Sequence, residues 1–419
     1  MEETVMELEL HRFIKKEEEG KYLSVNFQVP EQVETMEFSY SYDKKENIVD
    51  FGAAGEHEGF IGWSGSNRSR IRVSHRNSSS GFANVSIRQG QWQILLGAYK
   101  ICPQGVQVTC RVKFQMKSLR MFKGDTHIHS CASDGNMSVK ELELLAEKEG
   151  LDYLFLTDHN NYAHNDSISG EGKVKLLPGV EWTTYRGHAG MLGKARAFWN
   201  FISNSEQETR EIFRQAKERG SLIVLNHPFC PDCGWKWGME AVPWDLLEVW
   251  NGGTKPSANE SCLKWWDEQL QKGKKIAVTG GSDFHSLEPG RMPAMPCTCI
   301  YAESTEAEDL LEGLKSGHTC IALSPKGPFL QVPGKGRLPG DTLLVNTSLE
   351  LEFTGLKKGD CLFFITNGSS EKIVCDKENV KIKRIMEKRG YCRAEIRREL
   401  FPGTESLVFV SNPWYIVNT

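Results

Sequence analysis

The 419-residue sequence lacks any apolar run near the roughly 20 residues of a membrane-spanning helix. Its acidic start, Met1-Glu2-Glu3-Thr4, lacks the pattern of a secretory signal. It also lacks a strong charge of either sign, and a net charge of −4 gives no reason to expect a surface-wide nucleic-acid footprint. Internal repeats and long low-complexity tracts are missing too. These absences favour an ordinary globular protein of the cytoplasm, with no membrane partner and no strong nucleic-acid signal.

The sequence also lacks the dense cysteine framework of a small secreted domain, since its twelve cysteines are scattered through a long chain. One pair stands out, in Cys230-Pro231-Asp232-Cys233. A structural zinc site would need a second pair, which is missing. We therefore expect reduced, free thiols.

The composition is ordinary, with 39% hydrophobic and 25% charged residues, and the length allows two or three domains. Residues 1–118 alternate apolar and polar side chains with period two and predict a β-rich, sandwich-like domain. Residues 119–325 alternate short apolar strands with helices, which predicts parallel strands. A Pro- and Gly-rich linker follows, and residues 326–419 predict a small C-terminal β-domain.

Helix ends within residues 119–325 are marked by capping residues. Ser138 with Glu141, and Thr305 with Glu308, have the spacing of capping boxes. Ser205 opens a further helix, and residues 257–272 predict another. Each predicted helix is followed by a glycine, which favours the left-handed backbone that ends helices.

The chain is organised around the stretch from Gly124 to Gly135, which contains His127 and His129. Two histidines separated by one residue at a strand end point to the same side and can share one cation. The carboxylate of Asp134 can reach a neighbouring cation. Taken alone, the pair is equally compatible with two ordinary surface histidines near a turn.

Further ligand-type residues close four other apolar runs. The carboxyl ends of parallel strands meet at one rim, where active sites lie, so these residues are expected to gather there. They are His159, Glu181 with the nearby His188, His227, and Asp283 with His285.

In chain order the motifs are H-x-H-S-x-x-S-D-G, T-D-H, P-G-V-E, G-H, N-H-P and S-D-x-H. This set resembles the PHP (polymerase and histidinol phosphatase) metallohydrolases, and the fuller pattern resembles their CehA/McbA-type branch. The resemblance covers most of the chain and is strongest over residues 119–325. It implies an α/β fold in which a distorted seven-stranded (β/α) barrel is flanked by the two β-domains.

The resemblance also implies three cation sites, filled by two or three Mn, Zn or Fe ions. The first would be held by His127, His129, Glu181 and Asp283. The second would be held by Asp134, His159 and His285, and the third by His188 and His227 with Glu181 as a bridge.

Three further residues are candidates for catalysis. Asp158 could orient His159 or move a proton. Arg186 and Arg291 lie close in sequence to expected ligands, and either could bind a phosphate bidentately through two guanidinium N–H groups. For each arginine, an ordinary exposed position is an equally good interpretation.

The function that the resemblance implies is hydrolysis by a hydroxide that the metals share. We expect a phosphoesterase whose substrate is a phosphomonoester or a phosphodiester of a small molecule. Two alternatives stay open. One is a hydrolase of carbamates, amides or carboxylic esters, and the other is a non-catalytic scaffold whose metals only stabilise the fold.

Overall fold

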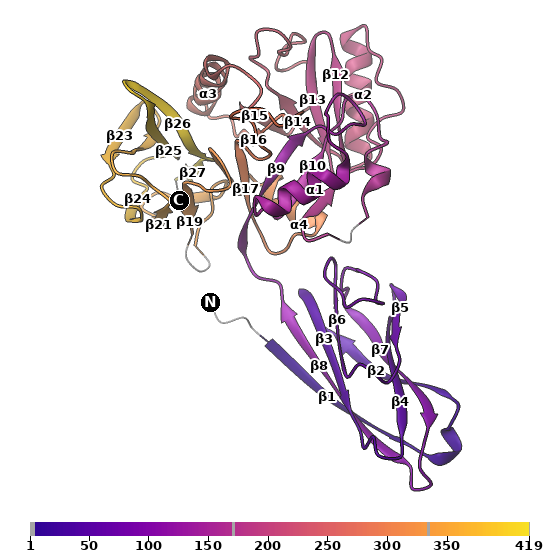
Figure 1. Cartoon of the computed structure of the whole chain (residues 1–419). Helices are drawn as coiled ribbons and strands as arrows, with labels where there is room; N and C mark the ends of the chain where they lie inside the picture. Colours follow the sequence, from indigo (N-terminus) through magenta and orange to yellow (C-terminus); the bar gives the residue numbers. More distant parts are fainter. Residues whose placement is uncertain (1–4, 170–171, 333–335, 419) are drawn as a thin grey trace. The chain divides into compact units, whose positions relative to one another are not determined.

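The computed structural model describes residues 5–169, 172–332 and 336–418 (Figure 1). By their contacts these residues divide into two compact units. One unit contains residues 5–118 with 172 and 173, and the other contains residues 119–169 and 174–418. None of the described helices is long and apolar enough to cross a bilayer.

The first unit consists of two antiparallel four-stranded sheets that enclose one core. Alternating side chains of both sheets are buried between them, among them Phe38 and Val112 from one sheet and Trp92 from the other. The first sheet has the order β1 (Val5–Ile14), β8 (Val106–Met116), β3 (Val33–Ser41) and β6 (Arg70–Ser74). The second has the order β2 (Tyr22–Val29), β7 (Gly90–Lys100), β4 (Ile48–Gly55) and β5 (Gly59–Ser64).

The second unit is built on two larger sheets. An eleven-stranded sheet begins with β11 (Lys175–Leu177), β10 (Tyr153–Leu156), β9 (Arg120–Ile128), β17 (Cys297–Ala302) and β18 (Thr319–Ala322). It continues through β26 (Thr404–Ser411), β25 (Gly390–Phe401), β22 (Cys361–Thr366) and β23 (Ser369–Val374), with β27 (Trp414–Val417) and β20 (Thr342–Leu344) at one side. A five-stranded sheet has the order β12 (Gly179–Thr184), β13 (Gly187–Leu192), β14 (Leu222–Asn226), β15 (Leu246–Asn251) and β16 (Ala277–Gly281).

Four α-helices accompany these sheets: α1 (Val139–Lys148), α2 (Glu206–Glu218), α3 (Pro256–Gln271) and α4 (Ala307–Lys315). The capping box at Ser138 and Glu141 forms as predicted, and Ser205 caps α2. The capping box predicted at Thr305 is wrong, because Glu306 is the residue before α4 and its side chain caps nothing. A glycine with positive φ follows each helix, as predicted.

Not all strands of residues 119–325 are parallel, contrary to the prediction. Strands β9, β10 and β11 pair in parallel, as do β14, β15 and β16. Strands β12 and β13 form an antiparallel hairpin, and β17 runs antiparallel to β9. No helix separates β12 from β13, so the chain reverses there without a crossover, whereas β13 and β14, and β17 and β18, pair antiparallel although a helix lies between them in sequence. Gly187, with φ of 130°, completes the hairpin turn.

The strands expected to close a seven-stranded barrel are divided between the two sheets. Isolated backbone bridges join the sheet edges, Ile128 with Phe284 and His159 with Glu181. The Asp283 N–H donates a hydrogen bond to the His127 carbonyl oxygen at 2.9 Å. The His129 N–H donates a hydrogen bond to the Phe284 carbonyl oxygen at 3.0 Å. These short links fall on expected metal ligands, so they fix where those side chains lie.

The C-terminal strands share a sheet and a core with residues 119–325, which corrects the expectation of a separate domain at 326–419. Strand β26 pairs with β18, so the C-terminal strands extend the eleven-stranded sheet. Buried Cys320, Leu330, Phe353 and Phe409 belong to one cluster. A smaller sheet of β19 (Phe329–Gln331), β21 (Ser348–Thr354) and β24 (Val380–Ile385) packs its apolar face into the same cluster, so the segment predicted to be a linker contains a strand.

Candidate metal centre

All nine side chains predicted as metal ligands lie in groups whose ligand atoms are within 4.8 Å of one another. They come from strand ends: His127 lies in β9, Glu181 in β12 and His188 in β13. His227 directly follows β14, and Asp283 follows β16 by two residues. His227 and Asp283 have positive φ values of 30° and 51°, a strained backbone that aims each side chain back into the group.

Glu181 occupies the middle of the centre. Its carboxylate is fully buried and faces five imidazoles. Oε1 lies 3.2 Å from His127 Nε2, 3.3 Å from His188 Nδ1 and 3.4 Å from His227 Nε2. Oε2 lies 2.8 Å from His159 Nδ1 and 3.7 Å from His129 Nε2. The Asn226 amide also donates to Oε1, at 2.8 Å.

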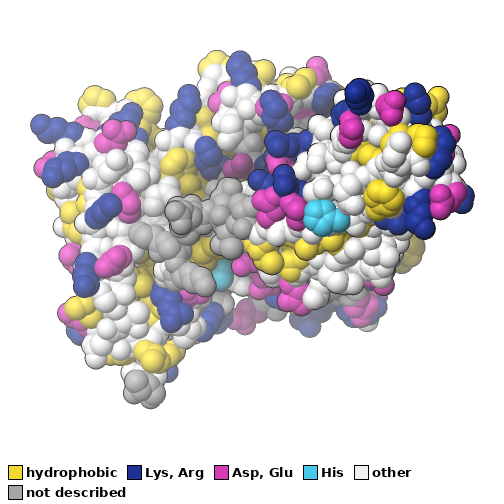
Figure 2. Space-filling view, turned by 90° about the horizontal axis from the view of Figure 1, so that it is seen from below, with side chains coloured by type: hydrophobic (Ala, Val, Ile, Leu, Met, Phe, Trp, Pro, Cys, Tyr) yellow, Lys and Arg dark blue, Asp and Glu magenta, His cyan; other side chains and the backbone are white. Residues whose placement is uncertain are grey.

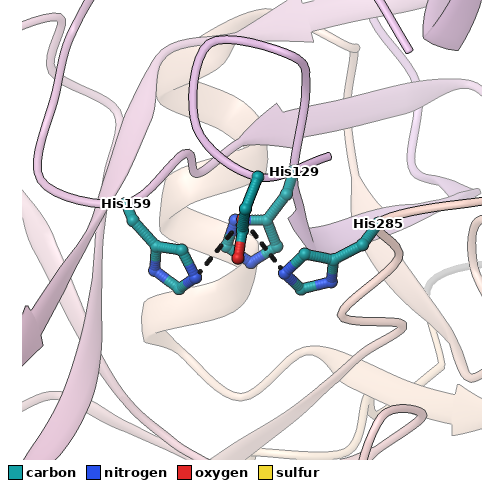
Figure 3. A group of neighbouring side chains, drawn as sticks. His129, His159 and His285 are labelled. Carbon is teal, nitrogen blue, oxygen red and sulfur yellow. Dashed lines mark ion pairs between the residues drawn. The ribbon is translucent and has the colours of Figure 1, made fainter. Parts of the chain in front are cut away.

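A second group lies beside it, where His129, His159 and His285 converge (Figure 3). The rings of His129 and His285 stack with centroids 4.2 Å apart. Asp134 completes the group, with Oδ1 3.3 Å from His285 Nε2 and 3.6 Å from His159 Nε2. Its side chain is more than half exposed, so the centre opens toward solvent here.

Asp283 connects the two groups. Its Oδ1 lies 3.1 Å from His129 Nε2 and 3.4 Å from His127 Nε2. The groups therefore overlap: His129 also belongs with Asp134, and His227 also lies with His127 and Asp283. The division of the ligands among three sites stays a prediction.

The unpaired atoms of the centre are those that a cation would engage. Both ring nitrogens of His129, Glu181 Oε2 and His188 Nδ1 are buried and make no hydrogen bond within the described residues. Buried polar atoms without partners are costly and rare in folded proteins. His129 Nε2 lies 3.7 Å from Glu181 Oε2, and His188 Nδ1 lies 3.3 Å from Glu181 Oε1, so the donor set fits divalent cations shared among them.

The electrostatics of the centre are dominated by burial and opposite charges. Burial raises the pKa of Glu181, but the imidazoles of His127 and His188 hold that pKa well below its usual range. Burial lowers the pKa of His127, yet the carboxylates of Glu181 and Glu248 hold that pKa well above its usual range. The carboxylates and imidazoles therefore stabilise one another's charge within the buried centre.

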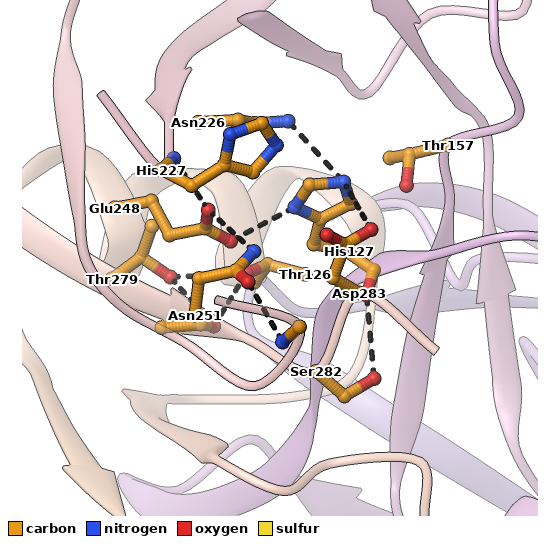
Figure 4. Close-up of polar contacts among 12 residues, drawn as sticks. Thr126, His127, Thr157, Asn226, His227, Glu248, Asn251, Thr279, Ser282 and Asp283 are labelled. Atoms are coloured by element: carbon orange, nitrogen blue, oxygen red, sulfur yellow. Dashed lines mark hydrogen bonds and ion pairs between the residues drawn. The ribbon is translucent and has the colours of Figure 1, made fainter. Parts of the chain in front are cut away.

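Glu248, on β15, was not predicted from the sequence and supports two ligands (Figure 4). The Nδ1–H of His127 donates to Glu248 Oε1 at 2.9 Å, which leaves Nε2 free to face the centre. The His227 N–H donates to Glu248 Oε2 at 2.8 Å, and the Asn251 amide donates to the same oxygen at 3.0 Å. A glutamate within the apolar run 246–250 was the available signal, because a buried carboxylate needs partners.

Asp125 is a second supporting residue that sequence reasoning missed. It is fully buried, and burial raises its pKa. Its carboxylate accepts hydrogen bonds from the N–H groups of His127, Ser282 and Ala294 and from the Ser282 hydroxyl. It therefore ties the His127 strand to the loop that carries Asp283. The sequence signal that could have identified Asp125 is its position two residues before the predicted ligand His127, in Gly124-Asp125-Thr126-His127.

Asp158 lies beside the centre and holds a loop. Its carboxylate accepts the N–H and hydroxyl of Ser130, at 2.9 and 2.8 Å, and those of Ser133, at 3.0 and 2.7 Å. His164, which we had not expected at the site, lies 3.2 Å away. The predicted contact with His159 is not found among the described residues; Thr183 Oγ1 lies 2.6 Å from His159 Nδ1 instead. Asp158 thus fixes the loop that carries Asp134.

The two candidate arginines lie in different surroundings. Arg186 lines a cleft of about 770 Å³ together with His188, Cys233 and Trp237. Its guanidinium carbon lies 4.2 Å from the centroid of the Trp237 ring, and one nitrogen donates to the Lys236 carbonyl oxygen at 3.2 Å. Arg291 is not among the residues lining this cleft; its Nε lies 3.5 Å from Glu288 Oε2.

No family model matches the chain. The chain is 40% identical over 205 residues to the DNA polymerase/3'-5' exonuclease PolX of Bacillus subtilis, a match covering 42% of this chain. It covers 36% of PolX, so the chain spans about a third of that relative's length.

Two solved structures are similar at lower identity. One is a two-domain protein from Bacteroides vulgatus containing a predicted PHP-like metal-dependent phosphoesterase, 19% identical, covering 70% of this chain and 95% of that one, with a TM-score of 0.40. The other is an amidohydrolase from Chromobacterium violaceum, 15% identical, covering 40% of this chain and 89% of that one, with a TM-score of 0.30.

The ordered motifs, the shared group of histidines and carboxylates that they build, and the sequence likeness to PolX agree with one another. The ordered motifs resemble those of the PHP (polymerase and histidinol phosphatase) family, and the sequence likeness to PolX fits that resemblance.

Proposed function

We propose that this protein is a metal-dependent hydrolase that cleaves phosphate esters of a small molecule. The observation that carries the proposal is the set of overlapping groups formed by nine histidine and carboxylate side chains, among them the buried Glu181, beside a cleft that reaches His188. Divalent cations bound there would lower the pKa of water and neutralise charge on a phosphoryl group.

The chain's own residues would position both reactants. Glu181 faces ligands of both groups and would hold adjacent cations at a fixed separation. Asp134 and His285 are the more exposed members, so water and the ester oxygen would enter on their side. The Arg186 guanidinium borders the cleft and has donors beyond the one that binds Lys236, so it would bind phosphate oxygens.

One observation favours a second function, hydrolysis of a carbamate, amide or carboxylic ester. The same cleft carries apolar and aromatic side chains, those of Tyr185, Phe201, Ile202 and Trp237. Such a lining suits an uncharged ester as well as the organic group of a phosphate ester. In the first function Arg186 would bind the phosphate of the substrate, whereas in the second function the substrate has no phosphate for Arg186 to bind.

A small-molecule substrate is also consistent with the charge distribution. Lys and Arg side chains are interspersed with Asp and Glu side chains on the face drawn in Figure 2. Nucleic-acid binding usually needs a basic surface of one sign. The CehA/McbA-type branch, the Mn, Zn or Fe identity of the ions, and a cytoplasmic location stay predictions of the sequence.

The test is an activity screen on protein loaded with Mn²⁺. Phosphomonoesters, phosphodiesters, carboxylic esters and carbamates are compared with wild type and with Asp283→Ala, whose metal content is measured in parallel. We expect hydrolysis of at least one phosphate ester, lost in the variant. Turnover of carboxylic esters or carbamates alone would favour the second function. Full metal loading with no turnover of any ester would favour a scaffold.

A further inference from the structure

The loop after β14 brings two cysteines together behind a residue of the metal centre. The Cys230 N–H donates to the His227 carbonyl oxygen at 2.9 Å, and the Gly234 N–H donates to the Cys230 carbonyl oxygen at 3.0 Å. The Sγ atoms of Cys230 and Cys233 lie 2.9 Å apart. A Cβ at Gly234 would lie 2.4 Å from the Cys230 carbonyl oxygen, so only glycine permits this tight turn.

Cys233 contacts His227 on the side away from the centre. Its Sγ lies 3.5 Å from His227 Nδ1, while His227 Nε2 faces Glu181 at 3.4 Å. Three other histidines of the centre have an oxygen atom as partner at Nδ1: Glu248 for His127, the Asp283 carbonyl oxygen for His285, and Thr183 Oγ1 for His159. Cys233 thus takes the place of an oxygen acceptor that holds a ligand imidazole in orientation.

The cysteine pair is open to small reagents. No disulfide is formed among the cysteines of the described residues. Most are buried, whereas Cys230 and Cys233 are partly exposed and Cys233 lines the cleft beside Arg186. A molecule that enters the cleft therefore meets Cys233.

We infer that Cys230 and Cys233 form a reversible dithiol–disulfide pair that controls how firmly His227 is held in the metal centre. The C-x-x-C spacing is that of redox-active pairs, and closing the bond requires the two sulfurs to approach by less than about 1 Å. In the disulfide, Cys233 Sγ is drawn toward Cys230 and away from its 3.5 Å contact with His227 Nδ1, so it no longer supports the His227 ring.

The oxidant that we propose for closing the Cys230–Cys233 bond is a low-molecular-weight disulfide. The Cys233 sulfur attacks one sulfur of that disulfide, whose S–S bond breaks and releases one small thiol. Cys230 then attacks the Cys233 sulfur of the mixed disulfide and releases the second small thiol. The protein loses two electrons and two protons, and the oxidant gains both as two thiols. A dithiol reductant reverses the sequence.

The effect should appear in metal affinity. Loss of a supporting partner typically weakens metal binding by about 10- to 100-fold. Closing the disulfide should therefore raise the Kd for Mn²⁺ by about tenfold or more, and reduction should restore it.

The experiment uses full-length protein treated with glutathione disulfide. The measurements are the intact mass, a peptide map, and the Kd for Mn²⁺ by competition with a coloured chelator. We compare wild type with Cys230→Ser, which keeps the Cys233 contact with His227 but cannot close the bond. Cys102→Ser, at a partly exposed cysteine of the other unit, is the matched control.

We expect wild type and Cys102→Ser to lose two hydrogen atoms, to show a Cys230–Cys233 link and to bind Mn²⁺ more weakly, reversibly. Cys230→Ser should bind Mn²⁺ as wild type does and keep that affinity after treatment. A link that leaves the Kd unchanged would overturn the inference. So would glutathione addition at the exposed Cys131 without a link. Because Mn²⁺ binding is read directly, the outcome is separate from whether phosphate esters are hydrolysed.

Discussion

At the scale of single residues, the centre depends on one carboxylate more than on any single histidine. Each histidine contacts at most three carboxylates, whereas Glu181 lies within 3.7 Å of five imidazoles. In a buried site this one negative charge would balance cations held by the surrounding rings, and the rings in turn keep the carboxylate ionised.

We predict that Glu181→Gln loses bound metal while the fold is retained. The amide has nearly the same shape but no charge, so bound cations would lose their shared counter-charge. Elemental analysis after incubation with Mn²⁺ should show less than about one equivalent. Glu248→Gln is the matched control, because Glu248 supports His127 and His227 without facing the shared group; its affinity should fall only about 10- to 100-fold. Full occupancy in Glu181→Gln would contradict the central role.

The two arginines are predicted to differ. Arg186→Ala should lower kcat/KM for a phosphate ester by at least roughly tenfold, because a charge-assisted contact to the transferring group is lost. Arg186→Lys should recover only part, since the planar fork is absent. Arg291→Ala, whose side chain pairs with Glu288, should have a smaller effect. Steady-state kinetics with metal content measured in parallel is the test; equal losses at both positions would refute the distinction.

At the scale of elements, the β12–β13 hairpin carries the centre and is supported by helix α2. Trp182 on β12 is fully buried and meets Phe213 of α2 edge-on, with ring centroids 5.4 Å apart. Phe213 also lies 5.9 Å from Trp235, in the loop that follows Cys233. One helix side chain therefore packs against both the strand of Glu181 and the loop behind His227.

We predict that Phe213→Ala destabilises the unit that contains the metal centre by about 3–5 kcal/mol, because it opens a cavity in a closed core. Urea denaturation followed by tryptophan fluorescence measures the change in unfolding free energy. Arg210→Ala on the exposed face of the same helix is the control, and should change stability by no more than about 0.5 kcal/mol. Similar effects of the two substitutions would show that this packing is not decisive.

At the scale of the whole molecule, the described chain has two units with separate cores, and all nine candidate ligands belong to one of them. A cation that binds only the folded form stabilises that form, so the gain should be confined to the unit that holds the ligands. The C-terminal strands share this unit's core, so their stability should follow the metal as well.

We predict two thermal transitions, of which a chelator lowers only one. Calorimetry of the Mn²⁺-loaded protein, before and after chelation, gives both midpoints. Phe213→Ala should lower the transition that responds to the chelator, and Phe38→Ala, in the core of the other unit, should lower the transition that does not. A single transition, or equal shifts of both on chelation, would contradict this division.

The sequence by itself determined which residues are candidate ligands, because ligand-type side chains at strand ends carry their chemistry in a local pattern. His127, Glu181 and Asp283 could be selected from motifs a few residues long, and the structure groups them. Local patterns also predicted the caps of α1 and α2, since a cap involves neighbours within one turn.

Only the tertiary structure decided which residues support the candidate metal ligands and in which direction the strands run. The contact of Glu248 with His127 spans 121 residues, and Asp158 binds Ser130 rather than its neighbour His159, which no local pattern reveals. Strand direction and the shared C-terminal core depend on which edges pair after the chain has collapsed. Those pairings depend on burial summed over distant segments, so they are properties of the packed molecule.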